Sequence, residues 1–68
     1  MDVRTAVAQA ESQDPAVGLR AVVVLRRLAD DVERTHVTAA RRSGWSWQQI
    51  ADALGVSRQA VHKKARRW

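Results

Sequence analysis

The chain has 68 residues and a mass of 7.6 kDa, contains no cysteine, and carries a net charge of +5. A chain of this length buries only about 60% of the surface that its unfolded form exposes. Without cysteine, neither a disulfide framework nor a thiolate metal site can reinforce so small a core. These numbers exclude disulfide-rich and zinc–thiolate folds, and they favour self-association.

Charge is distributed unevenly along the chain. Residues 1–40 contain five basic and six acidic side chains, whereas residues 41–68 contain seven basic side chains and a single acid, Asp52. Ten of the twelve basic residues are arginine, whose planar guanidinium suits phosphate groups and guanine edges. We therefore expect an anionic partner to bind the second part of the chain.

The sequence contains no candidate for a membrane span or a targeting peptide. The longest purely apolar run covers only residues 21–25, and the N-terminal stretch carries Asp2 and Glu11, unlike a signal peptide. We expect a cytoplasmic protein with no membrane partner.

The pattern of apolar residues predicts an all-α fold, because no stretch alternates as a strand does and Pro and Gly sit where helices would begin or end. A short N-terminal helix is expected from Asp2 to about Ser12. Asp2 is placed to cap it. Its apolar side is a narrow stripe at helical spacing, formed by Val3, Ala6, Val7 and Ala10.

A long second helix is expected to begin at Asp14-Pro15, a capping carboxylate followed by proline at the first helical position. Gly44 fits the position just past its end, so the helix has about 28 residues and a length of about 42 Å. Apolar residues recur along it at the alternating spacing of a coiled-coil seam. We predict a homodimer through this helix, formed by Val22, Leu25, Leu28, Ala29, Val32 and His36. The alternative is that the first helix alone covers this surface.

Two short helices complete the chain. Ser46 and Gln49 form a capping box, and Trp45 and Ile50 are spaced as a hydrophobic staple around it. Gly55 is expected to be left-handed and to turn the chain. Ser57 then caps a last helix that begins at Arg58. The residues expected to be buried in this part are Ile50, Ala51, Leu54, Val56 and Val61.

The stretch from Trp47 to His62 resembles a helix-turn-helix DNA-binding motif, with Ala51 at the helix crossing and Gly55 in the turn. With Val37, Ala40 and Trp45 upstream, the resemblance extends to a trihelical unit. The turn and last helix are similar to those of many bacterial regulators and of sigma-factor region 4, and the whole chain is similar to small actinobacterial helix-turn-helix proteins. The resemblance implies sequence-specific binding to double-stranded DNA and transcriptional regulation.

A helix-turn-helix presents its second helix to the major groove, N-terminal residues first. We therefore predict that bases are read by Arg58, Gln59, His62 and Lys63. Phosphates are expected to be bound by Arg41, Arg42, Ser46, Trp47, Gln48, Ser57, Lys64, Arg66 and Arg67. Core packing is the alternative role for Trp47. A symmetric dimer would place two recognition helices about 34 Å apart on an inverted-repeat site.

As a domain organisation, we predict a single domain over residues 1–68, with the first helix and dimerisation helix in 1–43 and the helix-turn-helix in 44–68. No metal site, cofactor or catalytic set is expected, because no ligand-spaced cluster, nucleophile triad or phosphate-binding glycine loop occurs. His36 is interpreted as a packed interface residue. Two other functions stay open: a module that binds RNA polymerase or another regulator, and an architectural DNA-coating protein.

Overall fold

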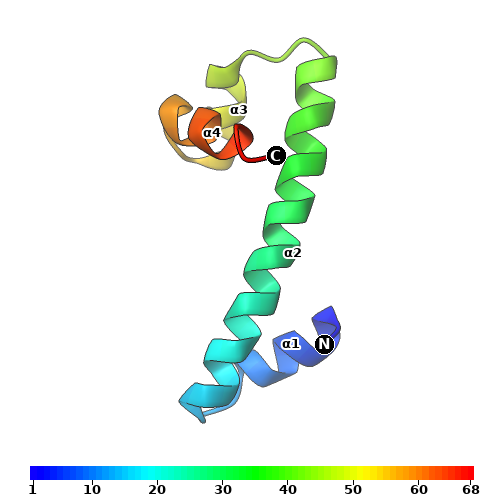
Figure 1. Cartoon of the computed structure of the whole chain (residues 1–68), viewed down its shortest axis with the longest axis vertical. Coiled ribbons are helices and arrows are strands. Elements are labelled where there is room, and N and C mark those ends of the chain that lie inside the picture. Colours follow the sequence, from blue (N-terminus) through cyan, green and yellow to red (C-terminus); the bar gives the residue numbers. More distant parts are fainter. The chain divides into compact units, whose positions relative to one another are not determined.

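The computed structural model describes residues 1–68 and contains four helices and no strand. The helices are α1 (Val3–Ala10), α2 (Pro15–Arg42), α3 (Trp47–Leu54) and α4 (Arg58–Ala65), as Figure 1 shows. The all-α prediction is therefore confirmed, and α2 has the predicted 28 residues. Contacts divide the chain into two compact units, Met1–Val32 and Glu33–Trp68. The last turns of α2 thus belong with the helix-turn-helix, whereas the sequence alone places the boundary at the end of the helix.

The first two helices begin at the aspartates predicted to cap them. The carboxylate of Asp2 accepts a hydrogen bond of 2.7 Å from the backbone N–H of Thr5, and Asp14 accepts one of 3.0 Å from Ala16. The hydrogen bond from the Thr5 backbone is the main reason why the pKa of Asp2 lies below its ordinary value of 3.8. Because this pKa is lowered, the charged cap stabilises α1 at pH values at and above the ordinary pKa of 3.8. The stabilisation is lost as the pH falls through the lowered pKa.

Two left-handed glycines end α2 and α3 in the same way. Gly44 has φ +89° and Gly55 has φ +70°, a conformation that costs other L-residues energy. After each glycine, the next N–H turns back to the helix: Trp45 donates to the carbonyl of Ala40 at 3.0 Å, and Val56 donates to that of Ala51 at 3.1 Å. Both ends are Schellman motifs, which satisfy carbonyls that the helix itself leaves free.

The Met1–Val32 unit buries very little. Ala6 and Ala21 are fully buried and are the only buried residues of this unit. Figure 1 shows α1 beside the first turns of α2, and the two helices make few contacts with each other. Larger apolar side chains of both helices stay exposed, among them Val3, Val7, Leu19, Val23, Leu28 and Val32. Within its own chain, α1 therefore leaves most of the apolar surface of α2 uncovered.

The Glu33–Trp68 unit has a core of four buried side chains, Val37, Ile50, Ala51 and Val61. Ala40 and Trp47 pack against this core and are half-buried. The predicted trihelical packing of the end of α2 with α3 and α4 is thus present.

Two residues expected to be buried, Leu54 and Val56, are exposed instead, and so is Trp45 of the predicted trihelical unit, which corrects the sequence analysis. Val56 is 47% exposed, Trp45 is 44% exposed and Leu54 is 40% exposed. Val56 and Trp45 each follow a left-handed glycine, where the chain leaves the helix end. Trp45 and Leu54 also line an open hollow of about 360 Å³ between α2 and α3, which no other part of the unit fills.

Replacement of Gly55 by Ala should destabilise the protein by about 1–2 kcal/mol, because an added Cβ meets no atom within 4 Å but the left-handed conformation becomes strained. Gly18 is the matched control, since it lies inside α2 and its Cβ would also meet nothing. Gly18→Ala should stabilise the protein by about 0.5–1 kcal/mol, the helix-propensity gain. Thermal unfolding followed by circular dichroism measures both. Equal effects of the two substitutions would contradict the left-handed turn.

Candidate nucleic-acid interface

The interface is built on α4, which α3 holds in place. Ala51 of α3 is fully buried and Val61 of α4 is 3% exposed, so the two helices meet at these residues. A small side chain at the crossing allows the helix axes to approach closely. Ser57 caps α4, with its hydroxyl oxygen accepting from the N–H of Ala60 at 3.1 Å. The short turn between α3 and α4 therefore has a fixed start and a fixed end.

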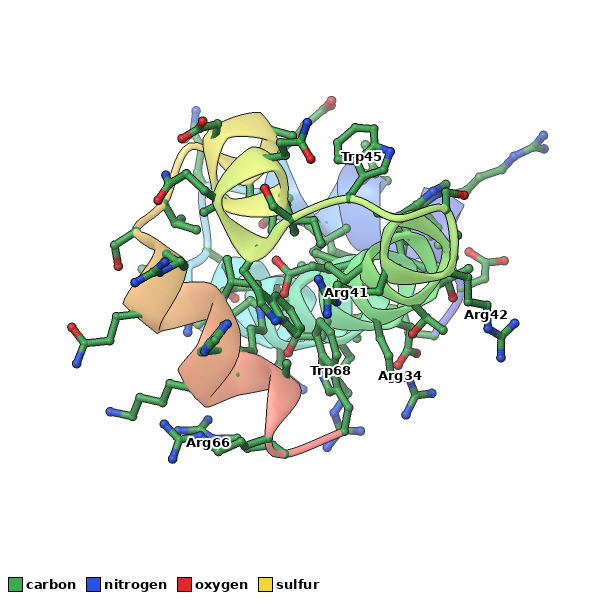
Figure 2. The ribbon with its side chains drawn as sticks, turned by 90° about the horizontal axis from the view of Figure 1, so that it is seen from above. Arg34, Arg41, Arg42, Trp45, Arg66 and Trp68 are labelled. Atoms are coloured by element: carbon green, nitrogen blue, oxygen red, sulfur yellow. The ribbon has the colours of Figure 1, made fainter.

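The face of α4 opposite its buried residue is polar and basic. With Val61 buried, helical periodicity places Gln59, Lys63 and Arg66, at spacings of four and three residues, on the outward side. These three side chains are exposed, as is Arg58 in the first helical turn. Figure 2 shows Arg66 extending away from the ribbon. No acidic residue occurs in α4, so this face carries positive charge without a carboxylate to repel an anion.

His62 is placed differently from the other predicted base readers. Its ring lies on a flank of α4 against the indole of Trp47, with ring centroids 4.5 Å apart and an angle of 76° between the planes. The same indole contacts Arg41, whose guanidinium carbon Cζ lies 4.6 Å from the ring centroid. Nη1 of Arg41 also donates a hydrogen bond of 2.8 Å to the carbonyl of Trp45. The structure therefore brings three predicted DNA-contacting residues into contact with one another, with Arg41 and His62 still exposed and Trp47 half-buried.

Lys64 is paired within the chain. Its ammonium lies 2.9 Å from Oε2 of Glu33 on α2, and both side chains are half-buried. The sequence predicts instead that Lys64 binds phosphate. A separation of 31 residues leaves no signal in the sequence for this pair.

The remaining predicted phosphate ligands are placed in three different ways. The hydroxyl of Ser46 and the side chain of Gln49 form the predicted capping box, with hydrogen bonds of 3.1 and 2.8 Å, and Gln48 donates to Asp52 at 2.9 Å. These side chains support the N-terminus of α3, where backbone N–H groups attract anions. Arg67 is exposed beyond the end of α4. Arg42, in contrast, points away from α3 and α4, as Figure 2 shows.

The six residues predicted for dimerisation are not equally accessible. Val22 and Leu25 are half-buried within the chain. The other four are exposed, namely Leu28, Ala29, Val32 and His36.

A three-helix unit with a capped, basic second helix across a glycine turn defines a helix-turn-helix DNA-binding protein. The comparison with known families agrees, because the sequence profile of the homeodomain-like domain matches residues 15–68. The chain belongs to the homeodomain-like domain family. No curated protein and no solved structure matches the chain. None of its helices combines the length and apolar character that a bilayer span requires.

Ser57 offers a test that separates the cap of α4 from contact with DNA. Asn and Asp both cap helices well, so Ser57→Asn and Ser57→Asp should keep the melting temperature, while Ser57→Ala should lower stability by about 0.5–2 kcal/mol. Only Ser57→Asp places a carboxylate where Ser57 is predicted to contact a phosphate, so it alone should weaken DNA binding without loss of stability. Thermal unfolding and fluorescence anisotropy with a labelled duplex measure the two effects. Equal DNA affinity of the Asn and Asp variants would place the start of α4 away from DNA.

Proposed function

We propose that the protein is a homodimeric transcriptional regulator of a bacterial cytoplasm that binds double-stranded DNA sequence-specifically through the major groove. The observation that carries this proposal is the outward face of α4, where Gln59, Lys63 and Arg66 are exposed opposite the buried Val61. A helix with such a face is suited to enter the major groove, which is wide enough to admit it.

Roles on this helix follow from residue chemistry. Arg58 in the first turn is suited to a bidentate contact with guanine O6 and N7, and Gln59 to the same kind of contact with adenine. Lys63, one turn further on, lies within reach of base edges or phosphates. Arg66 and Arg67 supply attraction to the phosphate backbone that does not depend on sequence. The backbone N–H groups at the start of α3, around Ser46 and Trp47, are proposed to hold a further phosphate.

Homodimerisation is supported by the surface of α2. Leu28 and Val32 lie one helical turn apart and are exposed, and Ala29 beside them is exposed too. Full burial of an exposed Val or Leu side chain stabilises by about 1.5–3 kcal/mol, so a partner helix that covers the exposed 38% of Leu28 and 49% of Val32 would gain about half of that at each. A second copy of the chain offers the matching stripe, because a symmetric interface uses the same patch on both subunits.

Selection of duplexes from a random pool by the intact chain, at near-physiological salt, tests the function directly. We expect an inverted repeat with half-sites one helical turn apart. Enrichment of a single half-site would support sequence-specific DNA binding but argue against the dimer. No enrichment by folded protein would favour the alternative of a module that binds RNA polymerase or another regulator.

Base and phosphate contacts should respond differently to substitution. Gln59→Ala should reduce discrimination at one base pair by about 1–3 kcal/mol. Arg66→Gln should weaken all duplexes alike and reduce the slope of log affinity against log salt by about 0.9. Arg42→Gln is the matched control, since this side chain points away from α4 and its loss should leave the slope unchanged. Titrations at several salt concentrations measure these slopes, and an equal change for both arginines would contradict the proposed interface.

Two valines of α2 test the dimer. Val32 is 49% exposed on the predicted seam, and Val23 is 53% exposed nine residues earlier, two and a half turns away on the opposite face. Val32→Lys should shift the protein to a monomer, because it buries a charge in the interface, while Val23→Lys should leave the dimer intact. Sedimentation equilibrium over a range of concentrations gives the mass of each. A mass that rises beyond a dimer for the unmodified chain would favour the DNA-coating alternative.

A further inference from the structure

We infer that Arg41 and His62 act on DNA recognition through Trp47, as positioning residues that fix the rotation of α4, and not by contacting DNA themselves; this inference rests on the proposed function. We call Arg41, Trp47 and His62 the Trp47 cluster. This positioning role of Arg41 and His62, both predicted to contact DNA, is not evident from the sequence.

The indole of Trp47 joins the three helices of the Glu33–Trp68 unit. Trp47 is the first residue of α3 and packs against the buried core. Arg41, from the last turn of α2, places its guanidinium 4.6 Å from the indole centroid, a cation–π distance. The hydrogen bond of 2.8 Å from Arg41 to the carbonyl of Trp45 fixes the same guanidinium at a second point. The indole thus covers one face of the guanidinium, and one of its five N–H groups is already used within the unit.

On the other side, Trp47 holds α4 through His62. The edge-to-face geometry, with centroids 4.5 Å apart, is a favoured one for aromatic rings. His62 directly follows the buried Val61 and precedes the outward Lys63, so it occupies the flank of α4 that faces α3. The ion pair of 2.9 Å between Lys64 and Glu33 ties α4 to α2 at a second point. The buried Val61, the ring contact of His62 and the ion pair of Lys64 together oppose rotation of α4 about its axis.

Rotation matters because base contacts tolerate little displacement. Side-chain tips lie about 5–6 Å from a helix axis, so a turn of about 10° moves them by about 1 Å. Hydrogen bonds are confined to donor–acceptor distances spanning about 0.5 Å, and a bidentate contact must satisfy two at once. Loss of the Trp47 cluster would therefore weaken the contacts of Gln59 and Lys63 without removing either side chain.

Two substitutions at His62 separate positioning from base reading. Phenylalanine keeps a ring against Trp47 but has no hydrogen-bonding nitrogen, whereas alanine removes both. We expect His62→Phe to bind the selected duplex within about twofold of the unmodified chain, with the same preference at every base pair. His62→Ala should bind it about tenfold more weakly and lose discrimination at the pairs read by neighbouring side chains. Equal losses at one base pair in both variants would show that His62 reads that base, and no change in either would show that the ring contact is dispensable. Both results overturn the inference.

Salt dependence provides the second measurement, at Arg41. Arg41→Gln should weaken binding severalfold while leaving the slope of log affinity against log salt unchanged, because no phosphate contact is lost. A slope reduced by about 0.9, as expected for Arg66→Gln, would show that Arg41 binds a phosphate and would overturn its positioning role. Trp47→Phe, which keeps an aromatic ring at the centre of the cluster, serves as a milder variant if His62→Ala fails to fold by circular dichroism. Failure of the proposed function is distinguishable, since the unmodified chain would then select no duplex.

Discussion

The close contact between α3 and α4 at Ala51 and Val61 is the interaction on which the DNA-binding unit depends. Only Val37 and Ile50 join these two residues in the buried core, and full burial of such aliphatic side chains contributes about 1.5–3 kcal/mol each. Local polar interactions must therefore contribute a large part of what holds the helices of this unit in their arrangement. The capping box at Ser46, the cap at Ser57 and the two glycine-terminated helix ends perform this function, because each satisfies backbone groups that so small a core leaves near solvent.

The Met1–Val32 unit has an even smaller buried core. Its only buried side chains are two alanines, which have little apolar surface to remove from water. The valines and leucines that could form a core are spread around α2, and a helix as short as α1 covers only one side of it. If a second copy covers the stripe at Leu28 and Val32, folding of this unit and association become one process. Stability would then depend on protein concentration, as in obligate dimers.

The sequence predicted the local features well, because they depend on residues three to five positions apart. The caps at Asp2, Ser46 and Ser57 and the turns at Gly44 and Gly55 all belong to this class. Features that require packing between helices were harder to predict. The exposure of Leu54 and Val56 depends on what the rest of the unit leaves open. The contact of Arg41 with Trp47 depends on side-chain rotamers, for which no spacing rule exists.

The sequence did contain a signal for the orientation of Arg42, which was predicted to bind phosphate but points away from α4. Val37 and Ala40 were expected to pack against the helix-turn-helix, and Arg42 lies about 160° from Ala40 on an α-helix. Helical periodicity therefore already turned Arg42 away from α4. The pairing of Glu33 with Lys64 had no such signal, since it joins distant positions of the chain.

Net charge overstates the number of phosphate contacts that this chain offers. Of the seven basic side chains in residues 41–68, Arg41 and Lys64 interact within the unit and Arg42 points away from α4. Four remain for DNA on or beside α4, namely Arg58, Lys63, Arg66 and Arg67. If one of them reads bases, a single chain neutralises about three phosphates through side chains, which corresponds to a salt slope of about −2.7. Such a slope is small for a specific DNA-binding protein, and a dimer doubles it. Two independent features thus support the proposed second copy, namely the uncovered apolar stripe of α2 and the few cations that α4 presents.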